Sequence, residues 1–124
     1  MRDRRLAVVV HDLQQARAVL ALEAADGLAI TLVSAPAAAA YAGVAFLQAM
    51  QQSLGREIVV DCGQDAGLVM AGLRAGLRRL LFAGPEDVGR RLGEMAGQSV
   101  VMRSVDMPMW HLDPGEMPRT FRTS

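Results

Sequence analysis

The sequence predicts a single α/β domain: a five-stranded parallel open sheet, Rossmann-like or flavodoxin-like, with helices on both faces. The chain has 124 residues, of which 52% are hydrophobic and 21% charged, a composition typical of one globular domain. Short apolar segments alternate with segments of helical periodicity. The short segments are apolar on both faces, as parallel strands covered by helices are. Half of a β/α barrel is the alternative, and it would need a partner to close.

The five predicted strands are short runs rich in Val, Ile and Leu. They cover residues 6–10, 28–33, 58–60, 79–82 and 100–105. Because a helical segment follows each of the first four runs after a short connection, we expect parallel strands joined by right-handed crossovers.

The helices between the strands are recognised from their apolar spacing and their end residues. Asp12 is placed to cap the first helix, and Gly55 is placed to end the second. Ser34 is placed as the cap of the second helix, two residues before Pro36. The helices are expected over residues 12–26, 36–54, 64–75 and 84–96.

Residues 1–105 form the predicted domain, and residues 106–124 form a C-terminal tail that contains three of the five prolines. The tail holds the only tryptophan, Trp110, and a phenylalanine, Phe121. Large apolar side chains are costly to leave in water. The tail is therefore expected to dock on the domain or on a neighbouring subunit.

The charge balance and the single cysteine limit the classes of partner and compartment. Acidic and basic residues number 13 each, so no global field attracts nucleic acid or an anionic membrane. Residues 27–55 carry no charge, but Pro36 and three glutamines favour a strand, a turn and a buried helix over a membrane span. Cys62 has no partner for an internal disulfide, which fits a reducing compartment, and a cytoplasmic protein is expected.

Two of the helical segments lack the polar stripe that a surface helix of a small monomer normally has. Segment 36–54 is apolar nearly all the way round, and segment 64–75 is rich in Gly and Ala. At least one of them is expected to pack against another subunit. The sequence therefore predicts a homo-oligomer formed through helix 36–54, helix 64–75 and the C-terminal tail.

Candidate catalytic residues follow the first and third predicted strands. His11 comes directly after the first strand, and Asp61 and Cys62 come directly after the third. If these strands are neighbours, the three side chains lie side by side. The start of the following helix would lower the pKa of the Cys62 thiol, with His11 as base and Asp61 to orient it. Each residue also has a structural interpretation: a buried Cys62, a His11 bonded to backbone, and an Asp61 that forms a turn.

Candidate ligand-binding residues lie at the carboxyl ends of the strands, where open parallel sheets bind their ligands. A helix start near Ser34 could bind a phosphate through backbone N–H groups, and Arg103 could add a charge-assisted fork. The structural interpretation of Ser34 is an ordinary helix cap. The predicted ligand-binding residues are Asp12, Ser34, Gly63, Gly84 and Arg103.

Several well-defined motifs are absent from the sequence. The turn after the first strand reads Val10-His11-Asp12-Leu13, without the glycines of a dinucleotide-binding turn. There is no G-x-S-x-G or H-E-x-x-H motif, and the chain contains no lysine. His11, His111 and Cys62 lack the spacing of zinc ligands. The sequence therefore indicates no particular cofactor and no metal.

In length and element order the chain resembles the receiver domains of response regulators. Such domains carry acids after the first strand and a phosphorylatable Asp after the third, and Asp12 and Asp61 hold those places here. A second acid beside Asp12, a hydroxyl at Ala83-Gly84 and a lysine are missing. The resemblance is one of layout, and it does not extend to the residues of the phosphorylation switch.

Three functions remain open from the sequence. The first is a homo-oligomeric binding or regulatory module for a small anionic metabolite, such as a nucleotide or phosphate ester, held at the strand ends. The second is a small cysteine-dependent enzyme that uses Cys62, His11 and Asp61. The third is a structural subunit whose role is association. The first is favoured because no reaction motif is present, while the carboxyl ends of such a sheet offer a cleft.

Overall fold

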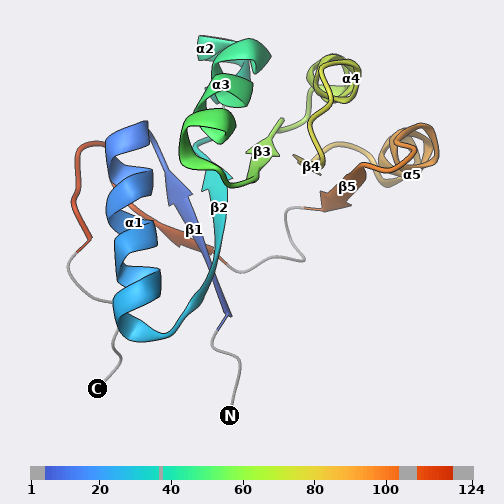
Figure 1. Ribbon diagram of the computed structural model, residues 1–124. Coiled ribbons are helices and arrows are strands. Elements are labelled where there is room, and N and C mark those ends of the chain that lie inside the picture. Colours follow the sequence, from blue (N-terminus) through green and yellow to red (C-terminus); the bar gives the residue numbers. More distant parts are fainter. Residues whose placement is uncertain (1–4, 37, 104–108, 119–124) are drawn as a thin grey trace.

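The computed structural model describes residues 5–36, 38–103 and 109–118, and it shows a parallel α/β sheet of six strands (Figure 1). The predicted fold class is confirmed, with one strand more than expected because the tail contributes the sixth. The strands are β1 (Arg5–Val10), β2 (Ala29–Ser34), β3 (Ile58–Asp61), β4 (Arg79–Phe82), β5 (Val100–Arg103) and β6 (Met109–His111). Residues 104 and 105 of the fifth predicted strand lie outside the described residues.

The helices follow the predicted order, with one division. Asp12 caps α1 as expected: its side chain accepts a hydrogen bond from the Gln15 N–H at 2.7 Å. The helix predicted over residues 36–54 is divided at Gly43, whose φ of +91° is a backbone conformation that favours glycine. The helices are α1 (Leu13–Asp26), α2 (Ala38–Ala42), α3 (Val44–Leu54), α4 (Ala66–Arg74) and α5 (Glu86–Met95).

The strand order is β5-β4-β3-β2-β1-β6, and every pair is parallel. It differs from the usual Rossmann order and from the flavodoxin-like order that receiver domains share. The first five strands follow one another along the sheet, as they would in half of a β/α barrel. Right-handed crossovers that all step in one direction place their helices on the same side of the sheet.

The core confirms that the long helices share one face of the sheet. Alternate strand residues, such as Val8, Leu32, Val60 and Leu80, pack against residues of α1, α3, α4 and α5. These residues form two clusters along the sheet, and Figure 1 shows the four helices following it in sequence. The buried helical members of the two clusters are Ala16, Val19, Ala39, Leu47, Met50, Val69 and Leu92, so the short helix α2 also contributes to this face through Ala39.

The other face of the sheet has a smaller cluster of its own. The cluster is buried, and among the described helices only α2 contributes to it, through Ala38. Helices on both faces of the sheet were predicted, but the long helices all lie on one face. The reason is the sequential order of β1 to β5, which has no reversal that would place a long helix on the other face. The buried members are Ala7, Val9, Val33, Ala35, Val59 and Leu81.

The described part of the tail joins the sheet. Strand β6 pairs with β1, with Trp110 opposite Val8 on the helix-covered face. Leu112, just beyond β6, is fully buried in the cluster under α1. The tail thus covers the open edge of β1 within the same chain. Phe121 lies outside the described residues.

The uncharged stretch from residue 27 to 55 forms β2, α2 and α3. A strand, a turn and a buried helix were expected here, and the structure differs only in dividing the helix at Gly43. Among the described residues, no helix has both the length and the apolar character needed to cross a membrane.

Candidate functional site

The carboxyl ends of the strands form one edge of the sheet, but they do not bring the predicted catalytic residues side by side. Strand β2 lies between β1 and β3, so His11 and the pair Asp61 and Cys62 belong to strands that are not neighbours. The condition on which the Cys62, His11 and Asp61 hypothesis was built is therefore not met. The strand order that decides this is a long-range property that local sequence does not specify.

Cys62 is a buried thiol in the core between the sheet and α3, α4 and α5. Its side chain is in the second core cluster and is 3% exposed, and the Sγ lies 3.8 Å from the Val60 carbonyl oxygen. Helix α4 begins only at Ala66, capped by Asp65, so Cys62 is not at the helix start. Burial, followed by the charges of Asp61 and Asp65, raises the pKa of Cys62 to about 12. The expectation of a lowered pKa is wrong, because desolvation opposes the thiolate.

His11 and Gln15 hold the tail against the carboxyl end of β1. The His11 Nε2 lies 2.8 Å from the Leu112 carbonyl oxygen, and the Gln15 Nε2 donates to the carbonyls of Asp113 and Glu116 at 2.9 and 2.6 Å. Gln15 is buried, and its Oε1 accepts from the His11 N–H at 2.7 Å. In open α/β sheets the ligand crevice lies where the strand order reverses, here between β1 and β6. These bonds fill that position with the chain's own backbone.

Ser34, Asp61 and Gly63 form a hydrogen-bonded turn at the ends of β2 and β3. The Ser34 Oγ accepts from the Asp61 N–H, and the Asp61 Oδ1 accepts from the Gly63 N–H, both at 2.9 Å. Ser34 is therefore not a helix cap, since α2 begins four residues later at Ala38. Asp61 forms a turn, which is the structural interpretation of that residue.

A first pocket of about 290 Å³ lies between the start of α5 and β5. It brings together two predicted residues, Gly84 and Arg103, and adds Arg90, which sequence reasoning missed. A Cβ on Gly84 would stand 2.3 Å from the Phe82 ring, so the ring lies directly against the glycine backbone. The sequence signal for Arg90 was its spacing, because it comes four residues after Glu86 on the predicted helix and residues at that spacing share one helix face.

A second pocket of about 260 Å³ lies between the ends of β1 and β2 and the helices α2 and α3. Ser34 and His11 line it, and the other described residues of its lining are apolar. The five predicted ligand-binding residues are thus divided: Gly84 and Arg103 share the first pocket, and Ser34 lines the second. Asp12 caps α1, and Gly63 belongs to the turn after β3.

Comparison with models of protein families, with curated proteins and with solved structures finds no match to this chain. Within residues 5–36, 38–103 and 109–118, no three His, Cys, Asp or Glu side chains group as they would around a metal ion. What distinguishes the candidate functions is therefore the chemistry of the two pockets and the burial of Cys62.

Proposed function

We propose that the protein is a binding module for a small anionic metabolite, a phosphate ester or a nucleotide, held in the first pocket. The observation that carries this proposal is the meeting of Arg90, Arg103 and the start of α5 on one hollow at the carboxyl ends of β4 and β5. Its volume of about 290 Å³ is at the lower end of ligand pockets, which favours a small ester over a dinucleotide.

Two kinds of donor are available to an anion in this pocket. The guanidinium groups of Arg90 and Arg103 present planar forks that match phosphate or carboxylate oxygens. Helix α5 begins at Glu86, and its N-cap residue Pro85 provides no side-chain cap, so the N–H groups of its first turn have no helical acceptor. The positive end of the helix dipole adds to the attraction for an anion.

Glu86 is the group that an anionic ligand would displace. Its Oε1 lies 3.4 Å from the Arg103 Nη1, and both side chains are exposed. An exposed ion pair of this length contributes little stability, so exchanging a carboxylate for a phosphate on Arg103 costs little. In the free protein the Glu86 carboxylate thus pairs with the Arg103 guanidinium and competes with the ligand for it.

Phe82 supports the apolar part of the ligand. Its ring lies against Gly84 and Gly89. Because neither glycine has a Cβ, no side chain of these two residues covers the ring at the wall of the pocket. A sugar or base of a phosphate ester can rest against such a wall while the phosphate meets the arginines. A bare inorganic anion would use only the polar half of the pocket.

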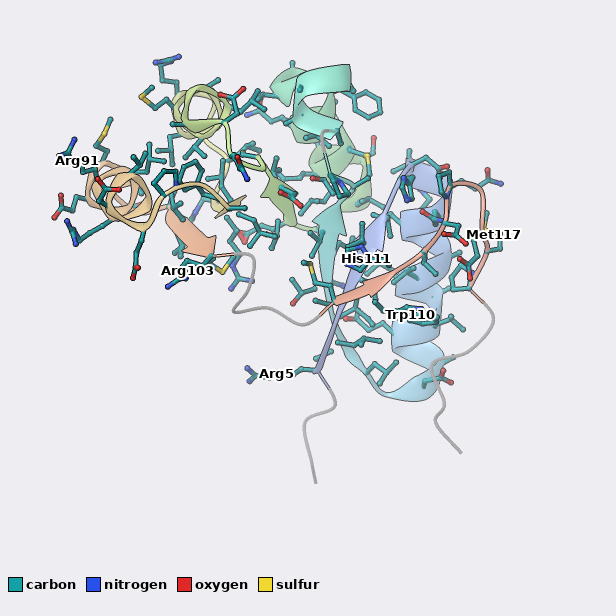
Figure 2. The ribbon with its side chains drawn as sticks, turned by 180° about the vertical axis from the view of Figure 1, so that it is seen from behind. Arg5, Arg91, Arg103, Trp110, His111 and Met117 are labelled. Carbon is teal, nitrogen blue, oxygen red and sulfur yellow. The ribbon has the colours of Figure 1, made fainter. Side chains whose placement is uncertain are left out.

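The experiment is a titration of the full chain with inorganic phosphate and with AMP, followed by amide chemical shifts of Gly84, Glu86 and Arg103. The variant Arg103→Gln should weaken AMP binding about tenfold, because one charge-assisted hydrogen bond is lost from an exposed site. Glu86→Gln should strengthen binding, since it removes the competing carboxylate. Arg91→Gln is the matched control, because Arg91 lies on the side of α5 that faces away from the sheet (Figure 2).

Absence of shifts with either probe at millimolar concentration would refute the proposal. So would an equal loss of affinity in the Arg91→Gln and Arg103→Gln variants, because that would show a response to net charge alone. Binding of AMP that Glu86→Gln weakens rather than strengthens would place the anion elsewhere.

We also propose self-association through the outer faces of α3, α4 and α5, which exposed apolar side chains favour. Phe46 on α3 is 50% exposed and Met95 at the end of α5 is 62% exposed. Met95, Met70 and Leu73 line a shallow hollow of about 240 Å³ between α4 and α5. Sedimentation of the full chain should show a dimer or larger species that the Phe46→Gln or Met95→Gln variant dissociates. A stable monomer at high concentration would refute this proposal.

A further inference from the structure

We propose that the second pocket binds a small uncharged molecule with an apolar body and one hydroxyl group, such as a phenol. This site is separate from the anion pocket between α5 and β5, and the two have no described lining residue in common. It lies on the helix-covered side of the sheet, under α2 and α3. Its ligand class follows from three features: the apolar wall, His11 and Ser34.

The wall of the second pocket is apolar and already in place. The lining includes the buried side chains of Val10, Leu47 and Met50, together with the half-exposed ring of Phe46. Among the described residues that line it, none is Asp, Glu or Arg. A charged ligand would lose its hydration without gaining a counter-charge, so the pocket favours a neutral molecule.

His11 supplies one hydrogen-bond acceptor to this pocket. Its Nε2 lies 2.8 Å from the carbonyl oxygen of Leu112, and a carbonyl can only accept. Nε2 therefore carries the proton of the neutral ring, and Nδ1 is left as an acceptor. Among the described residues, no donor lies within hydrogen-bonding distance of Nδ1.

Ser34 supplies one hydrogen-bond donor. The residue is 2% exposed, and its Oγ accepts from the Asp61 N–H at 2.9 Å. The hydroxyl proton has no acceptor within the part of the chain that the structure describes. A buried donor without an acceptor is costly, and a ligand oxygen would satisfy it.

The donor and the acceptor come from adjacent positions of neighbouring strands. Ser34 is the register partner of Val10, and His11 follows Val10 directly. A ligand hydroxyl can donate its proton to His11 Nδ1 while its oxygen accepts from Ser34 Oγ. A hydrocarbon makes neither bond, and a carboxylate cannot donate to Nδ1. The pair of groups thus selects a hydroxyl over both.

The test compares phenol, toluene and benzoate as probes of the full chain at pH 8, by amide chemical shifts. Phenol should shift Val10, Ser34 and Leu47 and should bind about tenfold more tightly than toluene, because it makes two additional hydrogen bonds. Benzoate should not bind this pocket. Toluene binding as tightly as phenol, tighter binding of benzoate, or no phenol shift up to its solubility limit would each overturn the proposal.

Two variants on one helix provide the matched control. Ala42 lines the pocket, whereas Ala40 is exposed on the same helix and does not line it. Ala42→Phe should reduce phenol affinity at least tenfold, and Ala40→Phe should leave it unchanged. Circular dichroism shows whether each variant is folded. If Ala42→Phe does not fold, Ser34→Ala tests the pocket instead, because it removes the hydroxyl group that donates to the ligand. Arg103→Gln should leave phenol binding unchanged, so failure here and failure of the anion site are distinguishable.

Discussion

The reactivity of Cys62 separates a binding module from a cysteine-dependent enzyme. The pKa of this thiol is raised to about 12 from an ordinary 9.0. At pH 7.5 the thiolate fraction falls from about 1 in 30 for a free thiol to about 1 in 30,000, a thousandfold loss. Because the thiolate is the nucleophile, native Cys62 should react with a disulfide reagent at least a thousandfold more slowly than in the unfolded chain. Burial of the sulfur adds a steric barrier in the same direction.

The assay follows the release of thionitrobenzoate from a disulfide reagent at pH 7.5, in buffer and in guanidinium chloride, with Cys62→Ala as the blank. Native labelling within about tenfold of the unfolded rate would refute the reasoning, and it would restore the enzyme hypothesis. A slow rate that rises steeply with denaturant is the expected result, because the thiol then reacts only when the core opens.

Three further predictions concern stability. Gln15→Met keeps the volume of a buried side chain but removes three hydrogen bonds. The free energy of unfolding should therefore fall by about 3 kcal/mol, and thermal unfolding should show Tm lowered by about 10 °C. Gly72→Ala should destabilise the protein by about 1 kcal/mol, because the new Cβ would stand 2.6 Å from the buried Leu80 Cδ2. Gly93→Ala, on an open helix face, should stabilise it by about 0.5–1 kcal/mol. Denaturant titrations in which both variants change the free energy of unfolding in the same direction would contradict this pair of predictions. The hydrogen bond from Arg56 lowers the pKa of Glu23 below its ordinary 4.5, so the stability that the pair adds is present above pH 4.5 and lost as pH falls through the lowered pKa. The stability gap between wild type and Arg56→Gln should therefore close in acid, and a gap that persists there would contradict the assignment.

The elements that could be predicted from sequence are those decided by local chemistry. The β-branched runs form strands, and Asp12 caps α1 because an aspartate before an apolar helical segment can accept from its first turn. The division at Gly43 was missed because alanine-rich sequence on both sides favours a continuous helix. Strand β6 was missed because its three residues become a strand only by pairing with β1, a contact about 100 residues away in sequence.

The candidate sites divide in the same way. Gly84 was expected after the fourth strand and Arg103 near the end of the fifth, and because β4 and β5 are adjacent parallel strands these two residues line one pocket. Ser34, with which Arg103 was expected to act, lines the other pocket. The catalytic hypothesis depended instead on β1 and β3 being neighbours, which only the complete strand order decides. Desolvation of Cys62 likewise depends on helices packed from distant segments, so the local position of a thiol could not predict the direction of its pKa shift.

The tail explains why both pockets lie away from the position where open α/β sheets usually bind ligands. The reversal of strand order falls between β1 and β6, and there His11 and Gln15 bond to the carbonyls that follow β6. A ligand at that point would have to displace a buried amide from two acceptors, which costs more than occupying a hollow that is already open. The open hollows of the edge therefore lie at its flanks: one beside α5, where arginines meet an uncapped helix, and one beside α2 and α3, where His11 and apolar side chains line the wall. His11 both holds the tail and lines the second pocket. The hydrogen bond from its Nε2 to the Leu112 carbonyl leaves Nδ1 as the ring nitrogen that can accept a hydrogen bond.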